Sequence, residues 1–139
     1  MSKNPSPAEI TRSYSVSHGR IPAAAVLAYM AKNTDMLPAV PNYGGYSIEE
    51  DILRVRLHLW KRGATLTTAT SLAKTYRIPA SFSEAKLVAA LTESRAKKYR
   101  ERESPPFPAN LLCGSTLPGK GGKYQSVKNS AGICAWKKV

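Results

Sequence analysis

The sequence predicts a mainly α protein: a small helical domain with an extended N-terminal arm and a short C-terminal β-hairpin-like module. Three observations lead to this prediction. Apolar residues recur at helical spacing, between start and stop signals, over residues 21–103. Residues 1–20 are polar and rich in Ser and Pro. Residues 109–139 combine five glycines with short apolar patches. The chain of 139 residues has the length of one ordinary domain.

The N-terminal third predicts an arm, one helix and a loop. Residues 1–20 lack the apolar content of a core segment, so we expect an arm that is disordered in isolation and able to lie along a neighbour. Pro22 suits the first position of a helix over about 22–33. Residues 36–47 are rich in Pro, Gly and Tyr and predict a loop.

The clearest helix is predicted to begin at Ser47. Ser47 and Glu50 have the spacing of a capping box, and three acidic residues occupy the first turn. Gly63 is placed to terminate this helix. Its apolar stripe is wide enough for the core of a small helical domain, and consists of Ile48, Ile52, Val55 and Leu59, widened by Leu53, Leu57 and Trp60.

A pair of helices is predicted to follow. The first covers residues 67–77 and ends at Ile78-Pro79, because a residue that precedes proline is pushed toward extended geometry. Ser81 and Glu84 have capping-box spacing, and a longer helix is expected over about 83–101. The second half of that helix is almost wholly charged, so we expect it to face solvent or a partner.

The C-terminal quarter is predicted to be a separate module. Residues 104–108 read Ser-Pro-Pro-Phe-Pro, which predicts a polyproline-type linker and a boundary between modules. The 109–139 segment is too short to build an independent core easily. We therefore expect it to dock on the helical domain of residues 21–103 or on a partner.

The net charge of +12 points to an anionic partner. The excess is +3 over residues 1–63, +4 over 64–103 and +5 over 104–139, where five lysines occur with no acid and no arginine. Lysine without arginine favours diffuse attraction to phosphate or to acidic protein surfaces over the reading of bases. Such a charge is typical of nucleic-acid binders and of proteins held inside ribosomes or virions.

Several classes are excluded or disfavoured by length and composition. The chain is too short for a TIM barrel or a complete dinucleotide-binding enzyme. No apolar run approaches the roughly 18 residues of a membrane span. The N-terminus lacks the apolar stretch of a secretory signal, so we expect a protein that is made and kept inside a cell.

No catalytic constellation and no cofactor site is visible, and we expect no enzyme activity. The run from Gly114 to Lys120 nearly spells a phosphate-binding loop, but Gly121 stands where Ser or Thr would hold magnesium. The same glycines fit a tight turn better.

The cysteines and histidines do not predict a metal site, because they lack the close spacing that zinc ligands usually show. Cys113 and Cys134 could form a disulfide in an oxidising compartment or in a particle, or they could remain reduced.

One segment, residues 67–91, is similar to a SAP-type helix–extension–helix. The resemblance rests on Leu72, Ile78, Pro79, Leu87, Val88 and Leu91. The sequence departs from that pattern at Arg77, where Gly is usual, and at Lys86, which lies directly before Leu87. The resemblance implies contacts of Lys74, Arg77 and Lys86 with a DNA backbone. The alternative is a plain helix–turn–helix element of the core.

A second pattern covers the C-terminal module, and it reads Tyr124-x-Ser126-x-x-Asn129-x-x-Gly132-x-x-x-Trp136 after a Gly-rich turn. This pattern resembles small basic virion proteins, the minor capsid proteins of large double-stranded DNA viruses of the chlorovirus and mimivirus kind. The acid usual before the last Gly of that turn is replaced by Lys120.

The second resemblance implies a minor capsid (cement) protein that binds the major capsid protein and other minor capsid proteins in the virion shell. It implies no small-molecule substrate. The alternative is sequence-nonspecific DNA binding, for which Lys120 and Lys123 would add contacts to those of the SAP-like segment. A protein of an RNA–protein assembly is a third reading.

The residues of this C-terminal pattern also make physical sense by themselves. Tyr124 and Trp136 are large anchors with a polar handle, and Asn129 with Gly132 suits a turn between short strands. In one reading, these residues and Ser126 contact a partner. In the other, Tyr124 and Trp136 pack the module's own small core.

Overall fold

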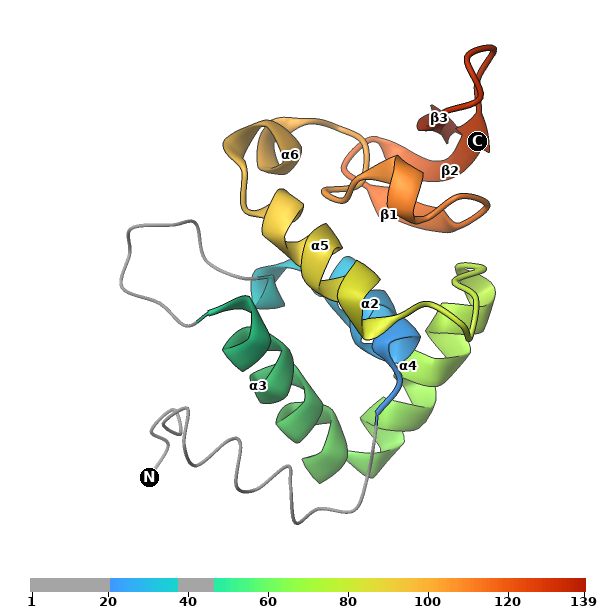
Figure 1. Cartoon of the computed structure of the whole chain (residues 1–139). Helices are drawn as coiled ribbons and strands as arrows, with labels where there is room; N and C mark the ends of the chain where they lie inside the picture. The colour runs from blue at the N-terminus through green and yellow to red at the C-terminus, as the bar shows by residue number, and fades with distance from the viewer. Residues whose placement is uncertain (1–20, 38–46) are drawn as a thin grey trace.

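The computed structural model describes residues 21–37 and 47–139 (Figure 1). The arm expected at 1–20 and most of the loop expected at 36–47 lie outside these residues. The prediction of a mainly α fold with a C-terminal hairpin-like module is confirmed. The elements are α2 (Ala23–Lys32), η1 (Thr34–Met36), α3 (Ile48–Lys61), α4 (Gly63–Thr75), α5 (Glu84–Ser94), α6 (Lys97–Glu101), η2 (Ala109–Leu111), β1 (Thr116–Gly119), β2 (Gly122–Lys128) and β3 (Cys134–Lys138).

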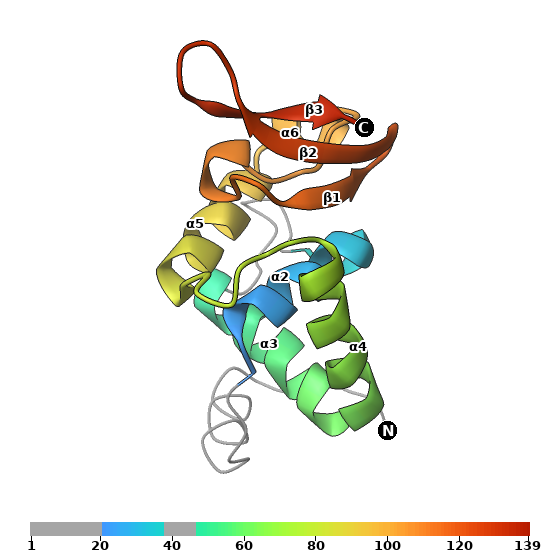
Figure 2. The same ribbon diagram turned by 90° about the vertical axis from the view of Figure 1, so that its right-hand side faces the viewer.

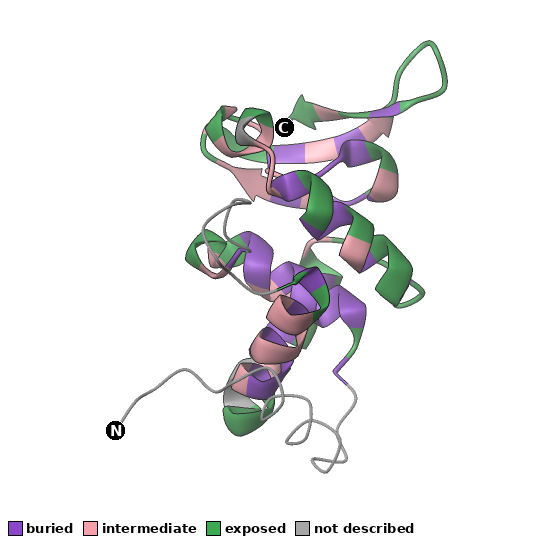
Figure 3. Cartoon of the chain, turned by 60° about the vertical axis from the view of Figure 1, so that its left-hand side comes forward, coloured by how far each residue is buried: buried purple, intermediate pink, exposed green. Residues whose placement is uncertain are grey.

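Helix α2 forms the centre of the core. It contacts α3, α4, α5 and β1, and eight of its ten residues are buried (Figure 3). Five of those eight are alanines, whose small side chains let the neighbouring helices approach closely. Val26, Leu27 and Met30 fill the space between them with no exposed surface. Pro22 is the residue before the first helical position, one place earlier than predicted.

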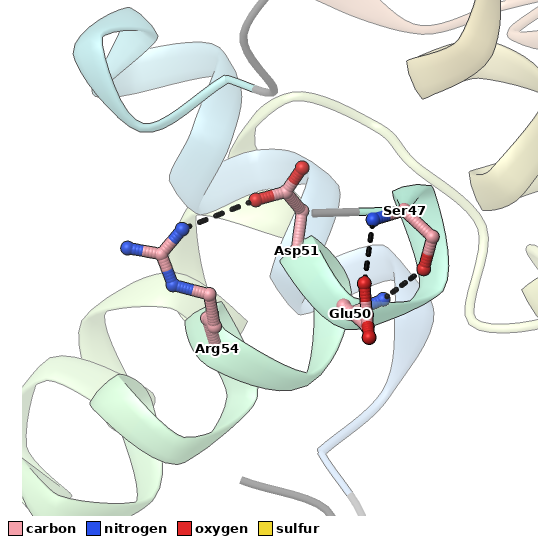
Figure 4. A network of polar contacts seen from close by, with 4 residues as sticks. All are labelled: Ser47, Glu50, Asp51 and Arg54. Atoms are coloured by element: carbon pink, nitrogen blue, oxygen red, sulfur yellow. Dashed lines mark hydrogen bonds and ion pairs between the residues drawn. The ribbon is translucent and has the colours of Figure 1, made fainter. Parts of the chain in front are cut away.

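The predicted capping box of α3 is present (Figure 4). The Glu50 backbone N–H donates to Ser47 Oγ at 3.1 Å, and the Ser47 backbone N–H donates to the Glu50 carboxylate at 2.7 Å. In the next turn Arg54 pairs with Asp51 at 3.4 Å. The two hydrogen bonds of the capping box satisfy backbone donors that a helix N-terminus leaves without intrahelical partners.

The prediction that Gly63 ends α3 is wrong. The helix stops at Lys61, because Arg62 leaves the helical region with φ −115° and ψ 75°. Gly63 begins α4, whose first turn is closed by the Leu66 N–H donating to the Arg62 carbonyl at 3.1 Å. A single non-helical residue therefore separates the two helices, and α4 starts four residues before the predicted position.

Arg56 is a buried cation that ties three segments together. It is 5% exposed, and its Nε donates to the Ile21 carbonyl, just before α2, at 3.0 Å. Its two terminal nitrogens pair with the Glu84 carboxylate on α5. This bidentate pair satisfies a charge that would otherwise be costly to bury.

The N-cap of helix α5 lies two residues after the predicted one. Ser83 is the N-cap, with Oγ accepting from the Lys86 N–H at 3.1 Å, so Ser81 does not cap and Glu84 is engaged by Arg56. The predicted single helix over 83–101 is also broken, because Ala96 is extended and separates α5 from α6. Arg100 Nε donates to the Ser94 carbonyl at 2.5 Å across this break.

The segment expected to be a linker, residues 104–108, belongs to the core. Phe107 has no exposed surface and joins the same cluster of buried residues as α2, Leu112 and Leu117. Arg102 holds the backbone of this segment by donating to the carbonyls of Pro105 and Phe107. The helical part and the C-terminal module therefore share one core.

The C-terminal sheet has three antiparallel strands in the order β1-β2-β3 and covers one end of the helices (Figure 2). The Lys120-Gly121 turn joins β1 to β2 and is closed by the Gly119–Gly122 pair. Gly119 passes so close to the segment before Pro105 that a Cβ there would lie 2.3 Å from the Glu103 carbonyl oxygen. Only glycine fits this contact.

Candidate binding surfaces

Tyr124, Ser126 and Trp136 face the inside of the molecule. Tyr124 is 9% exposed and Ser126 is 1% exposed. Ser126 Oγ donates to the Ala109 carbonyl at 2.7 Å, and Trp136 Nε1 donates to the Phe107 carbonyl at 2.8 Å. The cross-strand pairing of Ser126 with Trp136 sets both on one face of the sheet. These side chains dock the sheet on the core that it shares with the helices.

The other two residues of the pattern, Asn129 and Gly132, shape the connection from β2 to β3. Asn129 Oδ1 accepts from the N–H groups of Ala131 and Ile133, at 2.9 and 3.1 Å. Gly132 has φ +80°, a left-handed conformation that favours glycine. Both residues are exposed, and the loop they shape presents Ile133 with 58% of its surface exposed.

A disulfide joins Cys113 and Cys134, whose Cα atoms lie 5.6 Å apart. It links the segment before β1 to the first residue of β3. The disulfide fixes the start of β3, and the Trp136 hydrogen bond fixes its middle. The Ser126 hydrogen bond fixes the neighbouring strand β2. The sheet therefore keeps a fixed orientation on the body.

The outer face of the sheet is defined by Lys123, Gln125, Val127, Ala135 and Lys137. Strand alternation sets these side chains opposite Tyr124, Ser126 and Trp136. Lys123, Ala135 and Lys137 are exposed, and Gln125 and Val127 are half-buried. The apolar pair of Val127 and Ala135 therefore lies at one end of this face, and the two lysines lie toward the other end. Lys120, Lys128 and Lys138 are also exposed around the sheet.

The SAP-like segment consists of helix α4, an extended connection and helix α5, an arrangement that its two sequence readings share. Helix α4 ends with the Ile78 N–H donating to the Ala73 carbonyl and the Arg77 N–H donating to the Lys74 carbonyl. This is the double hydrogen bond of a Schellman motif, which requires a left-handed residue. Arg77 occupies that position with φ +60°, where the family pattern has Gly.

The structure exposes every cation that the sequence suggested for nucleic-acid contact. Lys74 and Arg77 lie at the end of α4, and Lys86 lies in the first turn of α5. Lys120 and Lys123 lie apart from these on the C-terminal sheet. The extension is fixed on the sheet by Ser115 Oγ, which donates to the Arg77 carbonyl at 3.2 Å, and by the Thr116 N–H, which donates to the Tyr76 carbonyl at 2.7 Å.

Burial shifts the pKa of titratable groups in the described helical part. His58 Nε2 lies 3.1 Å from the Tyr29 hydroxyl, and burial together with the Arg62 charge lowers the pKa of His58. Burial raises the pKa of Asp51, partly offset by Arg54. Within the described ranges, no three His, Cys, Asp or Glu side chains come together where a metal ion could be held.

Two cations that hold the fold together, Arg56 and Arg102, were not identified from the sequence pattern. Arg56 lies between Ile52 and Leu59 in the apolar stripe of α3, and this placement was the available signal for a buried charge. Arg102 had no comparable signal, since it lies in a charged run.

None of the helices in the described part of the chain is long and apolar enough to cross a membrane.

Comparisons with known proteins do not place this chain in a group. No family model, no curated protein and no solved structure matches it.

Proposed function

We propose that this chain is a structural minor capsid protein of a large DNA virus particle, acting as cement between neighbouring capsid proteins. The observation that carries the proposal is the use of the C-terminal pattern to build a rigid, presented sheet. Tyr124, Ser126 and Trp136 fasten the sheet on the body, so its outer face and the Ile133 loop stay outside. The resemblance of this pattern to small virion proteins supplies the kind of partner.

The edge strand and the charge indicate how a neighbour would bind. β3 is an edge strand of the sheet, so the backbone groups on its outer side can form hydrogen bonds with an added strand. Lys137 and Lys138 on that strand oppose pairing with a second copy of the same chain. An extended, acidic segment of a neighbouring capsid protein satisfies both conditions.

The first test is composition and contact in purified particles. Mass spectrometry of the particles should detect this chain, and lysine crosslinking should join Lys123 or Lys137 to other capsid proteins. Absence of the chain from the particles would reject the proposal.

A matched pair of variants tests the surface. Lys123→Glu with Lys137→Glu reverses two charges on the outer face and should weaken binding to the major capsid protein by about tenfold or more. Lys74→Glu with Lys86→Glu makes the same charge change on the SAP-like segment and should leave that binding within about twofold. Equal losses in the two pairs would show that only net charge matters.

The second candidate function is sequence-nonspecific DNA binding by the SAP-like segment. The observation that favours it is that Lys74, Arg77 and Lys86 are all exposed. Arg77 also has the left-handed backbone that shapes the extension between the two helices. Each neutralised phosphate should steepen the fall of log K with log[salt] by about 0.9. Lys74→Glu with Lys86→Glu should then reduce the slope by about 1.8, while Lys128→Glu with Lys137→Glu should preserve it. A flat salt response would reject this function.

A further inference from the structure

A cleft of about 540 Å³ opens where the end of α2, the α6 region and the β1–β2 turn meet. Its volume lies within the range of sites that hold small molecules. Apolar groups form part of the wall, including Leu37, Pro106 and Pro118, and two aromatic side chains join them, Tyr76 and Tyr99. None of the five residues that define the outer face of the sheet lines this cleft.

The charge in this cleft is one-sided. Lys32, Arg100, Arg102 and Lys120 line it, and no carboxylate is among its described lining residues. Glu101 and Glu103 are exposed neighbours in the sequence, but they do not line the cleft. Burial lowers the pKa of both guanidinium groups, and the Arg95 charge adds to this effect at Arg100. Four lining cations with no lining carboxylate favour an anion.

Arg102 is held rigidly in this cleft. Its Nε and Nη2 donate to the Pro105 carbonyl at 3.1 and 2.6 Å, and Nη2 also donates to the Phe107 carbonyl at 2.7 Å. The guanidinium carbon lies 4.2 Å from the centre of the Tyr99 ring. Nη1 forms no hydrogen bond with the described residues, so its two donors are available in a fixed orientation.

Lys120 is positioned in a similar way. Its Nζ donates to the Arg100 carbonyl at 2.8 Å, across the boundary between the helical part and the sheet. An ammonium group carries three donors, and this bond uses one of them. The Lys120 charge is therefore fixed near Arg100 and Arg102 with donating capacity left over.

We propose that this cleft binds a small ligand that carries two or more phosphate groups and has about the size of a nucleoside diphosphate. Several negative charges in a compact group match several cations around one small volume. The two Nη1 donors of a fixed guanidinium group and a lysine point charge suit phosphate oxygens. The rings of Tyr76 and Tyr99 offer apolar surface for the rest of the ligand. This proposal does not depend on the capsid proposal.

Calorimetric titration of the full chain at low salt provides the test, with ADP as the probe. Lys32→Glu with Lys120→Glu changes two exposed residues of the cleft and should weaken ADP binding by about tenfold or more. Lys128→Glu with Lys137→Glu makes an equal charge change outside the cleft and should alter it by no more than about twofold. Circular dichroism should show that all variants are folded.

Amide and side-chain NMR gives a second readout on the unmodified protein. Addition of ADP should shift the resonances of Tyr76, Tyr99 and Gly119, whereas adenosine at the same concentration should not. The proposal is overturned if ADP neither binds nor shifts these resonances, or if both variant pairs weaken binding equally. Citrate binding as tightly as ADP would reject phosphate as the recognised group. An eight-nucleotide single strand binding more tightly than ADP would assign the cleft to nucleic acid instead.

Discussion

The helical body, residues 21–103, and the C-terminal module, residues 109–139, share one core but are stabilised by different forces. In the body, α2 is surrounded by helices, and non-directional burial of Val26, Leu27 and Met30 dominates. In the module, Leu117 is the one fully buried aliphatic side chain of the described strands. There, side-chain hydrogen bonds and a disulfide fix the sheet.

This difference bears on function. A small sheet that relied on burial alone would need its apolar side chains on its inner face. The hydrogen bonds of Ser126 and Trp136, together with the disulfide, fix the sheet with few buried apolar residues. Val127 and Ala135 can therefore lie on the outer face, where a partner can cover them.

The largest expected effect is in the body. Leu27→Ala removes a fully buried side chain from the centre of α2 and should lower the free energy of unfolding by about 2–5 kcal/mol. Urea denaturation followed by circular dichroism and by tryptophan fluorescence checks this. A loss below about 1 kcal/mol would show that α2 is not the centre of stability.

The next effect is in the module. Cys113→Ser with Cys134→Ser opens a link across 21 residues and should cost about 3 kcal/mol. The loss should be local, so amide hydrogen exchange should accelerate in β3 far more than in α2. Equal acceleration in the two elements would erase the distinction between the regions.

A third change should stabilise the junction between the regions. Arg77→Gly relieves a left-handed conformation at φ +60° and should raise the free energy of unfolding by about 0.5–1 kcal/mol. Arg77→Ala removes the same charge without relieving the backbone and serves as the control. Urea midpoints compare the two variants. A Gly variant that is less stable than the Ala variant would show that the left-handed backbone at residue 77 is not a source of strain.

The smallest effect concerns pH in the body. Burial lowers the pKa of His58, so the unfolded chain takes up a proton at higher pH than the folded chain does. Stability should therefore fall as the pH drops below about 6.5 toward the folded pKa. NMR titration should place the pKa of His58 below its ordinary value. His58→Gln should flatten the change in urea midpoint between about pH 7.5 and 5.5, and an unchanged slope would assign it to other groups.

The parts of the fold that depend on neighbouring residues were predictable from the sequence. The Ser47–Glu50 capping box is satisfied within one helical turn, and the break at Ile78-Pro79 follows from backbone sterics. The cap of α5 was not predictable in this way. Ser81 and Ser83 are both suitable caps by residue type, and the pairing of Glu84 with Arg56, from another helix, is a tertiary contact that favours Ser83.

Tertiary contacts also explain why the linker prediction failed and why the binding surface was ambiguous. Phe107 among prolines looks like part of an extended segment until the Arg102 and Trp136 hydrogen bonds to its carbonyl are known. The C-terminal pattern named Tyr124 and Trp136 as anchors, but a sequence does not tell whether an anchor faces its own core or a partner. Strand register decides this, and it turns both toward the inside.

The most direct measurement is an electron cryo-microscopy map of the intact particle at side-chain resolution. We predict density for this chain in which Trp136 donates to its own Phe107 carbonyl. The outer face, the β3 edge or the Ile133 loop should contact a neighbouring capsid protein. Density that shows Trp136 inserted into a neighbour, or particles without this chain, would contradict this prediction.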